Sequence, residues 1–295
     1  MKIILCILLS CTWFTLVVAQ DSSSKKWSFA AGIKMNQLAT VDPVALDSTG
    51  TFLSITPSIK ITHPSGIGLG ISTNFLAGGQ QPGYYMTVVS LGYAIDRPNM
   101  ALDISYAHFF LQHNLAIPYT PIINELYAAY TYKSWFLQPH IGFDFGFGKD
   151  TSSGVTTAAD DINLFAGVTH SFDWDLSDAV SLDFSPVLQL NAGTNRYFEF
   201  LRATGYITHS SKYKSIVKSQ GRGIGRGNSG NNGNSSSPTS LEGLGIANLE
   251  ANIDLSLSIG HFTIEPSGSL FIPFRGDDKQ IFGLWQLELR YEFGK

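Results

Sequence analysis

The sequence has few cysteines, few charges and, beyond its first residues, no long apolar run. Both cysteines, Cys6 and Cys11, lie within residues 1–19. Without that segment, the chain has no disulfide to stabilise it in an exported compartment. No later stretch approaches the roughly 20 consecutive apolar residues that a membrane-spanning helix needs. If the chain crosses a bilayer, it must do so as a closed β-barrel, because hydrocarbon leaves no water to satisfy backbone polar groups.

The composition bounds the fold class. The chain has 295 residues, of which 44% are hydrophobic and 14% are charged. This balance excludes wholesale disorder and is ample for one large all-β domain. The formal net charge of −4 gives no reason to expect nucleic acid as a partner.

The first residues have the pattern of an export signal. Lys2 precedes an apolar run that ends at Ala19, and Val17 and Ala19 occupy the −3 and −1 positions of a cleavage site before Gln20. We therefore predict a cleaved signal peptide at 1–19 and a mature barrel at 20–295. Lipid attachment at Cys11 is a weaker alternative, because more apolar residues follow it rather than a polar tether.

Alternation of apolar and polar residues runs through most of the chain and predicts strands. Segments of 10–13 residues are long for a soluble sandwich, where about 5–6 is common, and they match the roughly 9–11 residues of a membrane-crossing strand. Twelve strands are predicted, at 27–39, 52–62, 66–77, 84–95, 100–110, 125–136, 138–148, 162–172, 180–193, 246–258, 261–273 and 281–293.

The connections alternate between short and long, with Asp173 to Ala179 among the short ones. This is typical of outer-membrane barrels, which have short periplasmic turns and long extracellular loops. The predicted fold is all-β, a single antiparallel transmembrane β-barrel of about 12 strands. A secreted soluble barrel or sandwich is the alternative, because alternation of apolar and polar residues does not show which face of the sheet contacts water. Aromatic residues near the strand ends favour the membrane barrel, because such residues gather at the two lipid–water interfaces. Those on the long-loop side are Tyr84, Tyr85, Phe109, Phe110, Phe271 and Phe274.

The last predicted strand has one face made of Gly283, Trp285, Leu287, Leu289, Tyr291 and Phe293. Through these residues the strand resembles the C-terminal strand of Gram-negative, Bacteroidota-type, outer-membrane β-barrel proteins. Here Gly294 and Lys295 follow the final aromatic residue, whereas most members end on it. The resemblance implies an outer-membrane location, contact with membrane lipid and lipopolysaccharide, and recognition by the barrel-assembly machinery. It says nothing of activity.

If the bulky residues face lipid, the intervening charged residues face the interior. Acids outnumber bases there, and an acidic lumen favours cations. We predict a passive channel for small polar or cationic solutes, with no metal or other cofactor. In the alternative, Glu288 and Arg290 pair with Glu265 or Glu292, and the interior is packed and non-conducting. Inward glycines and Ser72 favour open space. The predicted wall comprises Lys34, Lys60, Asp103, Asp144, Asp183, Glu250, Asp254, Glu265, Glu288 and Arg290, and Glu125, Lys133 and Glu292 also face inward; the small residues are Gly68, Gly70, Ser72, Gly142, Gly146 and Gly148.

The longest connection, 194–245, is basic and ends in a low-complexity glycine- and serine-rich stretch. It is predicted to be a flexible extracellular loop that gates the lumen, binds lipopolysaccharide phosphates, or is simply solvated. His209 and Ser211 have a spacing that resembles the catalytic pair of outer-membrane lipid hydrolases, which is a remote alternative function. Those enzymes have Asn after the serine, whereas this chain has Lys212, so no catalytic residue is predicted.

Overall fold

The computed structural model describes residues 27–41, 49–77, 82–112, 121–150, 156–194, 244–274 and 281–293. Within these ranges no helix is both long and apolar enough to span a membrane. The ranges contain strands β1 (Ser28–Val41), β2 (Thr49–Thr62), β3 (Ile67–Ala77), β4 (Gly83–Arg97), β5 (Met100–Leu111), β6 (Ile122–Tyr132), β7 (Gln138–Asp150), β8 (Thr157–Thr169), β9 (Phe172–Ser177), β10 (Val180–Gly193), β11 (Gly245–Ile259), β12 (Phe262–Pro273) and β13 (Phe282–Phe293).

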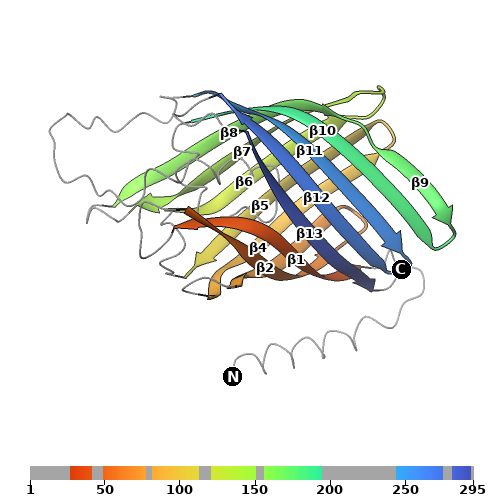
Figure 1. Ribbon diagram of the computed structural model, residues 1–295, viewed down its shortest axis with the longest axis horizontal. Coiled ribbons are helices and arrows are strands. Elements are labelled where there is room, and N and C mark those ends of the chain that lie inside the picture. Colours follow the sequence, from red (N-terminus) through yellow and green to blue (C-terminus); the bar gives the residue numbers. More distant parts are fainter. Residues whose placement is uncertain are drawn as a thin grey trace, which may run out of the picture.

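These strands form one antiparallel sheet that closes on itself (Figure 1). The last strand pairs with the first, from Phe29 opposite Phe293 to Asn36 opposite Gln286. Three strands away in the ring, β10 pairs with β11 along its whole length. Strand β9 follows β8 along the same edge of β10, so the thirteen strands occupy twelve positions in the ring. The predicted twelve-stranded closed barrel is therefore confirmed.

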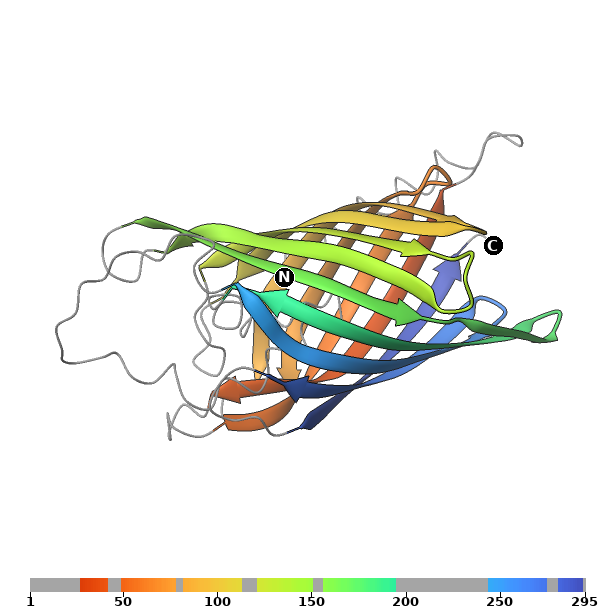
Figure 2. The same ribbon diagram turned by 90° about the horizontal axis from the view of Figure 1, so that it is seen from above.

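One predicted connection is wrong. The segment from Asp173 to Ala179 is mostly strand β9, not a turn. Its apolar residues Phe172, Trp174 and Leu176 alternate with Asp173 and Asp175, which is the period of a strand. Figure 2 shows that the β9–β10 hairpin projects past the neighbouring strands at one end of the barrel.

The two ends of the barrel differ. One end, here called the turn side, carries the tight turns between β2 and β3 and between β11 and β12. Gly66 and Gly260 have φ angles of 98° and 59° in these turns, a backbone region that side chains disfavour. The opposite end is the loop side, where the segments that connect the strands lie outside the described residues.

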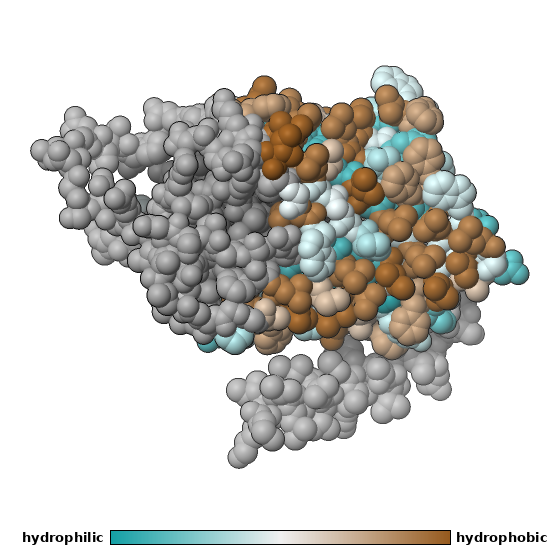
Figure 3. Space-filling view, in the orientation of Figure 1, coloured by the Kyte–Doolittle hydropathy of each residue, from teal (hydrophilic) through white to brown (hydrophobic). Residues whose placement is uncertain are grey.

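The wall of the barrel is apolar outside and polar inside. On β3, Leu69 and Ile71 are 50% and 47% exposed, whereas Asn74 is fully buried. Figure 3 shows that apolar side chains cover much of the described surface on the face in view. Residues in register on neighbouring strands point to the same side of the sheet. On the outer side, for example, Ile59, Ile71 and Val89 lie in register across β2, β3 and β4. The polar residues of each strand therefore form a continuous interior surface.

Candidate functional site: the barrel interior

The turn-side half of the interior contains a cavity of about 350 Å³, here called the vestibule. Its wall comes mainly from β2, β3 and β4, with contributions from β1, β5 and β13. Its size lies at the lower end of small-molecule pockets, which span roughly 300–1,000 Å³. The inward residues that line it include Lys34, Ser58, Lys60, Gly68, Gly70, Ser72, Ser90, Gly92, Asp103, Ser105, Glu288 and Arg290.

Packing does not require glycine at two positions of the vestibule wall. A Cβ added to Gly68 would first meet Ile61 O at 3.5 Å, and one added to Gly92 would meet Ile104 O at 3.6 Å, both ordinary contacts. Neither residue is among the glycines with positive φ in the described chain. Glycine within a strand weakens the strand. The missing side chains keep this part of the interior open.

Two charged side chains face the vestibule without a close partner. Lys60 on β2 and Asp103 on β5 both line it, and both are exposed. Within the described chain neither forms a salt bridge or a hydrogen bond through its side chain. The Lys60 side chain leans over β3, because its Cε lies 3.7 Å from where a Gly68 Cβ would be.

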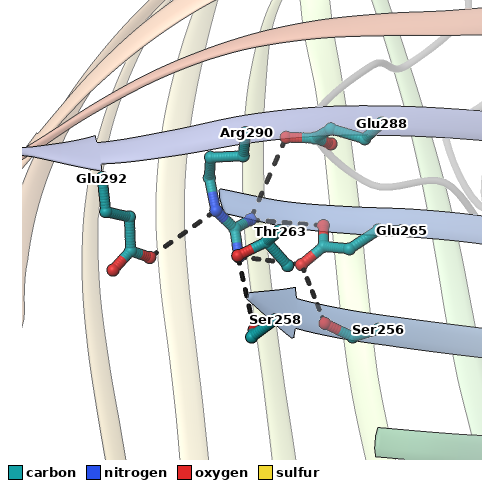
Figure 4. Close-up of polar contacts among 7 residues, drawn as sticks. All are labelled: Ser256, Ser258, Thr263, Glu265, Glu288, Arg290 and Glu292. Carbon is teal, nitrogen blue, oxygen red and sulfur yellow. Dashed lines mark hydrogen bonds and ion pairs between the residues drawn. The ribbon is translucent and has the colours of Figure 1, made fainter. Parts of the chain in front are cut away.

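A third charge in the vestibule is neutralised. Arg290 on β13 donates hydrogen bonds to both carboxylate oxygens of Glu265 on β12, at 2.8 and 3.2 Å (Figure 4). Its guanidinium also lies 4.0 Å from Glu288 and 3.6 Å from Glu292. One base therefore serves three acids, which is the pairing that the sequence raised as an alternative to an open acidic wall.

Elsewhere in the interior, polar side chains from β7, β10 and β11 form a buried network. The Gln189 amide donates to Asn191 Oδ1 at 2.9 Å, and Asn191 donates to Asn248 Oδ1 at 2.8 Å and to Glu250 at 2.9 Å. His140 on β7 joins it through Gln189 at 3.2 Å. These side chains are at most 8% exposed. Buried polar groups linked in this way fix one packing of the interior.

Bulky, buried side chains lie on the inward faces of the strands at the loop side of the interior. We call this set the constriction, and its members are at most 7% exposed. The Tyr85 hydroxyl on β4 forms a hydrogen bond of 3.0 Å with Ser54 on β2, across the intervening strand β3, so its ring points inward. The predicted loop-side aromatic band is thus wrong in part, because Phe110 and Phe274 are 52% and 44% exposed on the outside while Tyr85, Phe109 and Phe271 lie inside. The constriction comprises Leu76, Tyr85, Val88, Phe109, Phe271 and Leu284.

The predicted lumen residues do not share one environment. Lys60, Asp103, Glu288 and Arg290 line the vestibule, with Lys34 at its inner end and 8% exposed. Asp144 on β7 and Glu250 on β11 are fully buried. Asp183, Asp254 and Glu265 are half-buried on β10, β11 and β12.

The small inward residues also divide into two groups. Gly68, Gly70 and Ser72 line the vestibule. A side chain at Gly142 would overlap the ring of Phe165, and one at Gly148 would overlap the backbone of Pro121. Gly142 and Gly148 therefore permit close packing instead of leaving open space. The prediction that small inward residues leave open space agrees with the vestibule wall and is wrong for these two glycines on β7.

The residues of the predicted assembly signal lie on the outer face of β13. Trp285, Leu289 and Phe293 are 50%, 39% and 51% exposed. Gly283, Leu287 and Tyr291 share their parity on the strand. The strand pairs on both edges and closes the ring.

Other predicted features lie outside the described residues. They are the signal peptide at 1–19, the greater part of the 194–245 loop, and the His209 and Ser211 pair. In the described ranges, no group of three or more metal-ligating side chains is gathered at one point.

Comparisons with known proteins concern the fold. No protein-family model matches the chain, and no curated protein matches its sequence. Its structure is similar to the translocator domain of the autotransporter NalP from Neisseria meningitidis (11% identity, 95% of this chain and 92% of that chain, TM-score 0.43). It is also similar to an outer-membrane channel from Pseudomonas putida F1 (8% identity, 93% and 100%, TM-score 0.42) and to the β domain of the Bordetella autotransporter BrkA (11% identity, 91% and 100%, TM-score 0.40).

These likenesses are to Gram-negative outer-membrane barrels with different functions. The class of fold is established by the molecule itself, through the closed antiparallel ring and its apolar outer face. The chain is a β-barrel of the outer-membrane type.

Proposed function

We propose that this chain is a narrow outer-membrane channel for small polar solutes, with a preference for cations. The observation that carries the proposal is the vestibule, a cavity of about 350 Å³ inside the ring that is lined by small and charged residues. A larger side chain would fit at positions 68 and 92. A barrel that served only as a scaffold would therefore not need Gly68 and Gly92.

The membrane location follows from the outer surface. Apolar residues such as Ile141, Leu91 and Ile253 are 60%, 54% and 54% exposed, on strands that pair on both edges. Exposing so many large apolar side chains to water opposes solubility, whereas a bilayer accepts them. The alternating C-terminal strand β13 supports assembly by the barrel-assembly machinery in the outer membrane, with lipid and lipopolysaccharide around the mature chain.

The excess of acids over bases on the inward faces of the barrel as a whole supports the proposed preference for cations. Near Arg290 the carboxylates of Glu265, Glu288 and Glu292 outnumber the one base. Asp183 and Asp254 add further acids on β10 and β11. Carboxylates in a narrow, low-dielectric passage attract cations and raise their local concentration.

The constriction limits what can pass. Phe109 and Phe271 are 2% and 0% exposed at the loop-side end of the interior. Solutes that enter the vestibule therefore meet an apolar barrier, and conduction requires these side chains to move. We expect low conductance from the native chain.

The test is single-channel recording from the refolded mature chain in planar bilayers. Replacing both rings, Phe109→Ser with Phe271→Ser, removes apolar bulk from the constriction and is expected to raise conductance several-fold. The matched control is Phe110→Ser, which changes an adjacent aromatic residue that is 52% exposed on the outer face. Absence of channel steps from the native chain and from the widened variant would reject the proposal.

A non-conducting barrel that binds a partner or lipopolysaccharide through its loop side is the second candidate. The buried network around Gln189 and Asn191 favours it, because hydrogen-bonded side chains fill that part of the interior. It predicts that the widened variant stays silent. A lipid hydrolase based on His209 and Ser211 gains no support from the described residues.

A further inference from the structure

We infer that the vestibule contains a binding site for short zwitterionic peptides, in which Lys60 holds the carboxylate and Asp103 holds the ammonium group. This inference rests on the proposed function, because it names a class of solute that the channel takes up. Three features of the cavity wall carry the inference. They are two opposite charges, a surface without side chains between them, and hydroxyl groups beside that surface.

The two charges lie at opposite sides of a smooth surface. Gly68 on β3 is in register with Gly92 on β4, and Gly92 is in register with Ser105 on β5. Asp103 is the next inward residue on β5 towards the turn side, and Lys60 reaches over Gly68 from β2. The two strands that separate the charges therefore present little more than backbone between them.

The span suits a ligand with separated charges. Neighbouring strands lie about 4.8 Å apart, so the backbones of β2 and β5 are about 14 Å apart along the wall. The Lys60 side chain shortens that gap because it extends towards Asp103. The two ends of an extended peptide of two or three residues lie about 7–10 Å apart. A single α-amino acid is shorter than this gap.

Both charges are available to a ligand. Lys60 and Asp103 form no salt bridge with another described side chain, whereas Lys133 lies 2.5 Å from Asp96 and Arg290 lies 2.8 Å from Glu265. Lys60 and Asp103 attract each other across the cavity, and a carboxylate on Lys60 and an ammonium group on Asp103 would give each a partner at hydrogen-bond distance. Charge-assisted hydrogen bonds of this kind are about twice as strong as neutral ones.

The peptide backbone of the ligand also has partners. Ser72 and Ser90 line the same cavity beside Gly70 and Gly92. Their hydroxyl groups can donate to a carbonyl or accept from an N–H. The site therefore matches a peptide through its two ends and its amide groups, without a pocket for a particular side chain.

The test is calorimetric titration of the refolded mature chain in detergent micelles with triglycine. N-acetyl-triglycine and triglycinamide, which each lack one terminal charge, serve as matched ligands. We expect triglycine to bind at least tenfold more tightly than either. Equal affinity for all three peptides, or no binding of triglycine, would overturn the inference.

Charge exchange tests the two residues directly. Lys60→Asp alone and Asp103→Lys alone should each weaken triglycine binding at least tenfold. The double variant, with both changes, should recover most of the affinity, because the ligand can bind in the reverse direction. Folded mobility in gels is the control that each variant still forms the barrel. The assignment of the two residues would be overturned if both single variants bound triglycine unchanged, or if a folded double variant did not recover binding.

A filling substitution tests the location. Gly92→Leu places a side chain between the two charges and should abolish triglycine binding. The control is Gly268→Leu, which adds the same bulk at a strand glycine on the outer face, where an added Cβ meets just Leu284 O at 3.9 Å. Equal losses in the two variants would overturn the site. Triglycine binding by a chain that never conducts would reject the channel and leave the site in place.

Discussion

Arg290 on β13 and Glu265 on β12 are diagonal neighbours on adjacent strands, joined by two hydrogen bonds of 2.8 and 3.2 Å. The pair lies inside the barrel next to Glu288 and Glu292 (Figure 4). Such an arrangement links the closing strand to its neighbour and reduces the negative charge at the turn side. Its loss should therefore change both stability and ion preference.

We expect Arg290→Met to destabilise the barrel by about 1–3 kcal/mol, because it removes charge-assisted hydrogen bonds and leaves three carboxylates together. The measurement is the urea midpoint for loss of the folded band in gels. Lys133→Met is the control, because its partner Asp96 is 73% exposed and a surface pair contributes about 0–1 kcal/mol. Equal midpoints for the two variants would contradict a structural role for Arg290.

Alanine should be tolerated at Gly92 and harmful at Gly167. A Cβ at Gly167 would overlap the carbonyl oxygen of Leu188 and lie 2.7 Å from Gln189 Cβ, whereas one at Gly92 makes ordinary contacts. Overpacking of this kind costs roughly 1–3 kcal/mol. Refolding yield and urea midpoint are the readouts, and a Gly167→Ala barrel as stable as Gly92→Ala would show that the interior is looser than described.

The buried amide network should be sensitive to an apolar replacement. Asn191→Leu removes the donor to Asn248 Oδ1, one of the donors to Glu250 Oε2 and the acceptor of the Gln189 amide, at a cost of about 1–3 kcal/mol. Leu190→Ile, on the outer face of the same strand and 39% exposed, is the matched control. If Asn191→Leu and Leu190→Ile have the same urea midpoint of unfolding, the network does not stabilise the fold.

Interior acids should set the ion preference of any conducting form. Asp183→Asn combined with Asp254→Asn removes two neighbouring carboxylates, since Asp183 lies opposite Ser256 and Asp254 lies opposite Ser185. The reversal potential in a KCl gradient should move towards zero in the Phe109→Ser, Phe271→Ser background. Asp96→Asn, at the exposed turn, should leave it unchanged. A reversal potential that is the same in both cases would mean that these acids do not face the ion path.

Alternation in the sequence was sufficient to predict the strands and the closed ring. The segment 261–273 was expected as a strand and is Phe262–Pro273, for example. The sequence prediction of a short connection at 173–179 misses the β9 hairpin, because acids such as Asp173 and Asp175 are typical of turns, although Phe172 and Trp174 alternate with them. Acids on a strand that extends past its neighbours can remain in water.

The inward aromatic residues were missed for a different reason. Bulky residues were assigned to the outside, but adjacent residues on a strand face opposite sides. Phe109 and Phe110 are neighbours, so one of them must point inward, and Phe271 precedes Ile272 in the same way. Doubled apolar residues near a strand end are the signal that indicates a filled barrel end.

The candidate site was predicted less completely than the fold. Parity gave the inward position of Lys60 and Asp103, but whether two inward charges pair depends on the register between strands. That register brought Glu265 beside Arg290 and left β3 and β4 between Lys60 and Asp103. No pattern within one strand contains this information.

The most direct test of the whole account compares two adjacent residues on β3. Ile71→Cys and Ser72→Cys are labelled with an environment-sensitive fluorophore in the refolded mature chain, in vesicles with and without brominated lipid. We predict that bromolipid quenches the label at Ile71, which is 47% exposed on the outer face, and that a water-soluble quencher reaches the label at Ser72 in the vestibule. The opposite pattern, with the label at Ser72 in lipid and the label at Ile71 in water, would contradict the account.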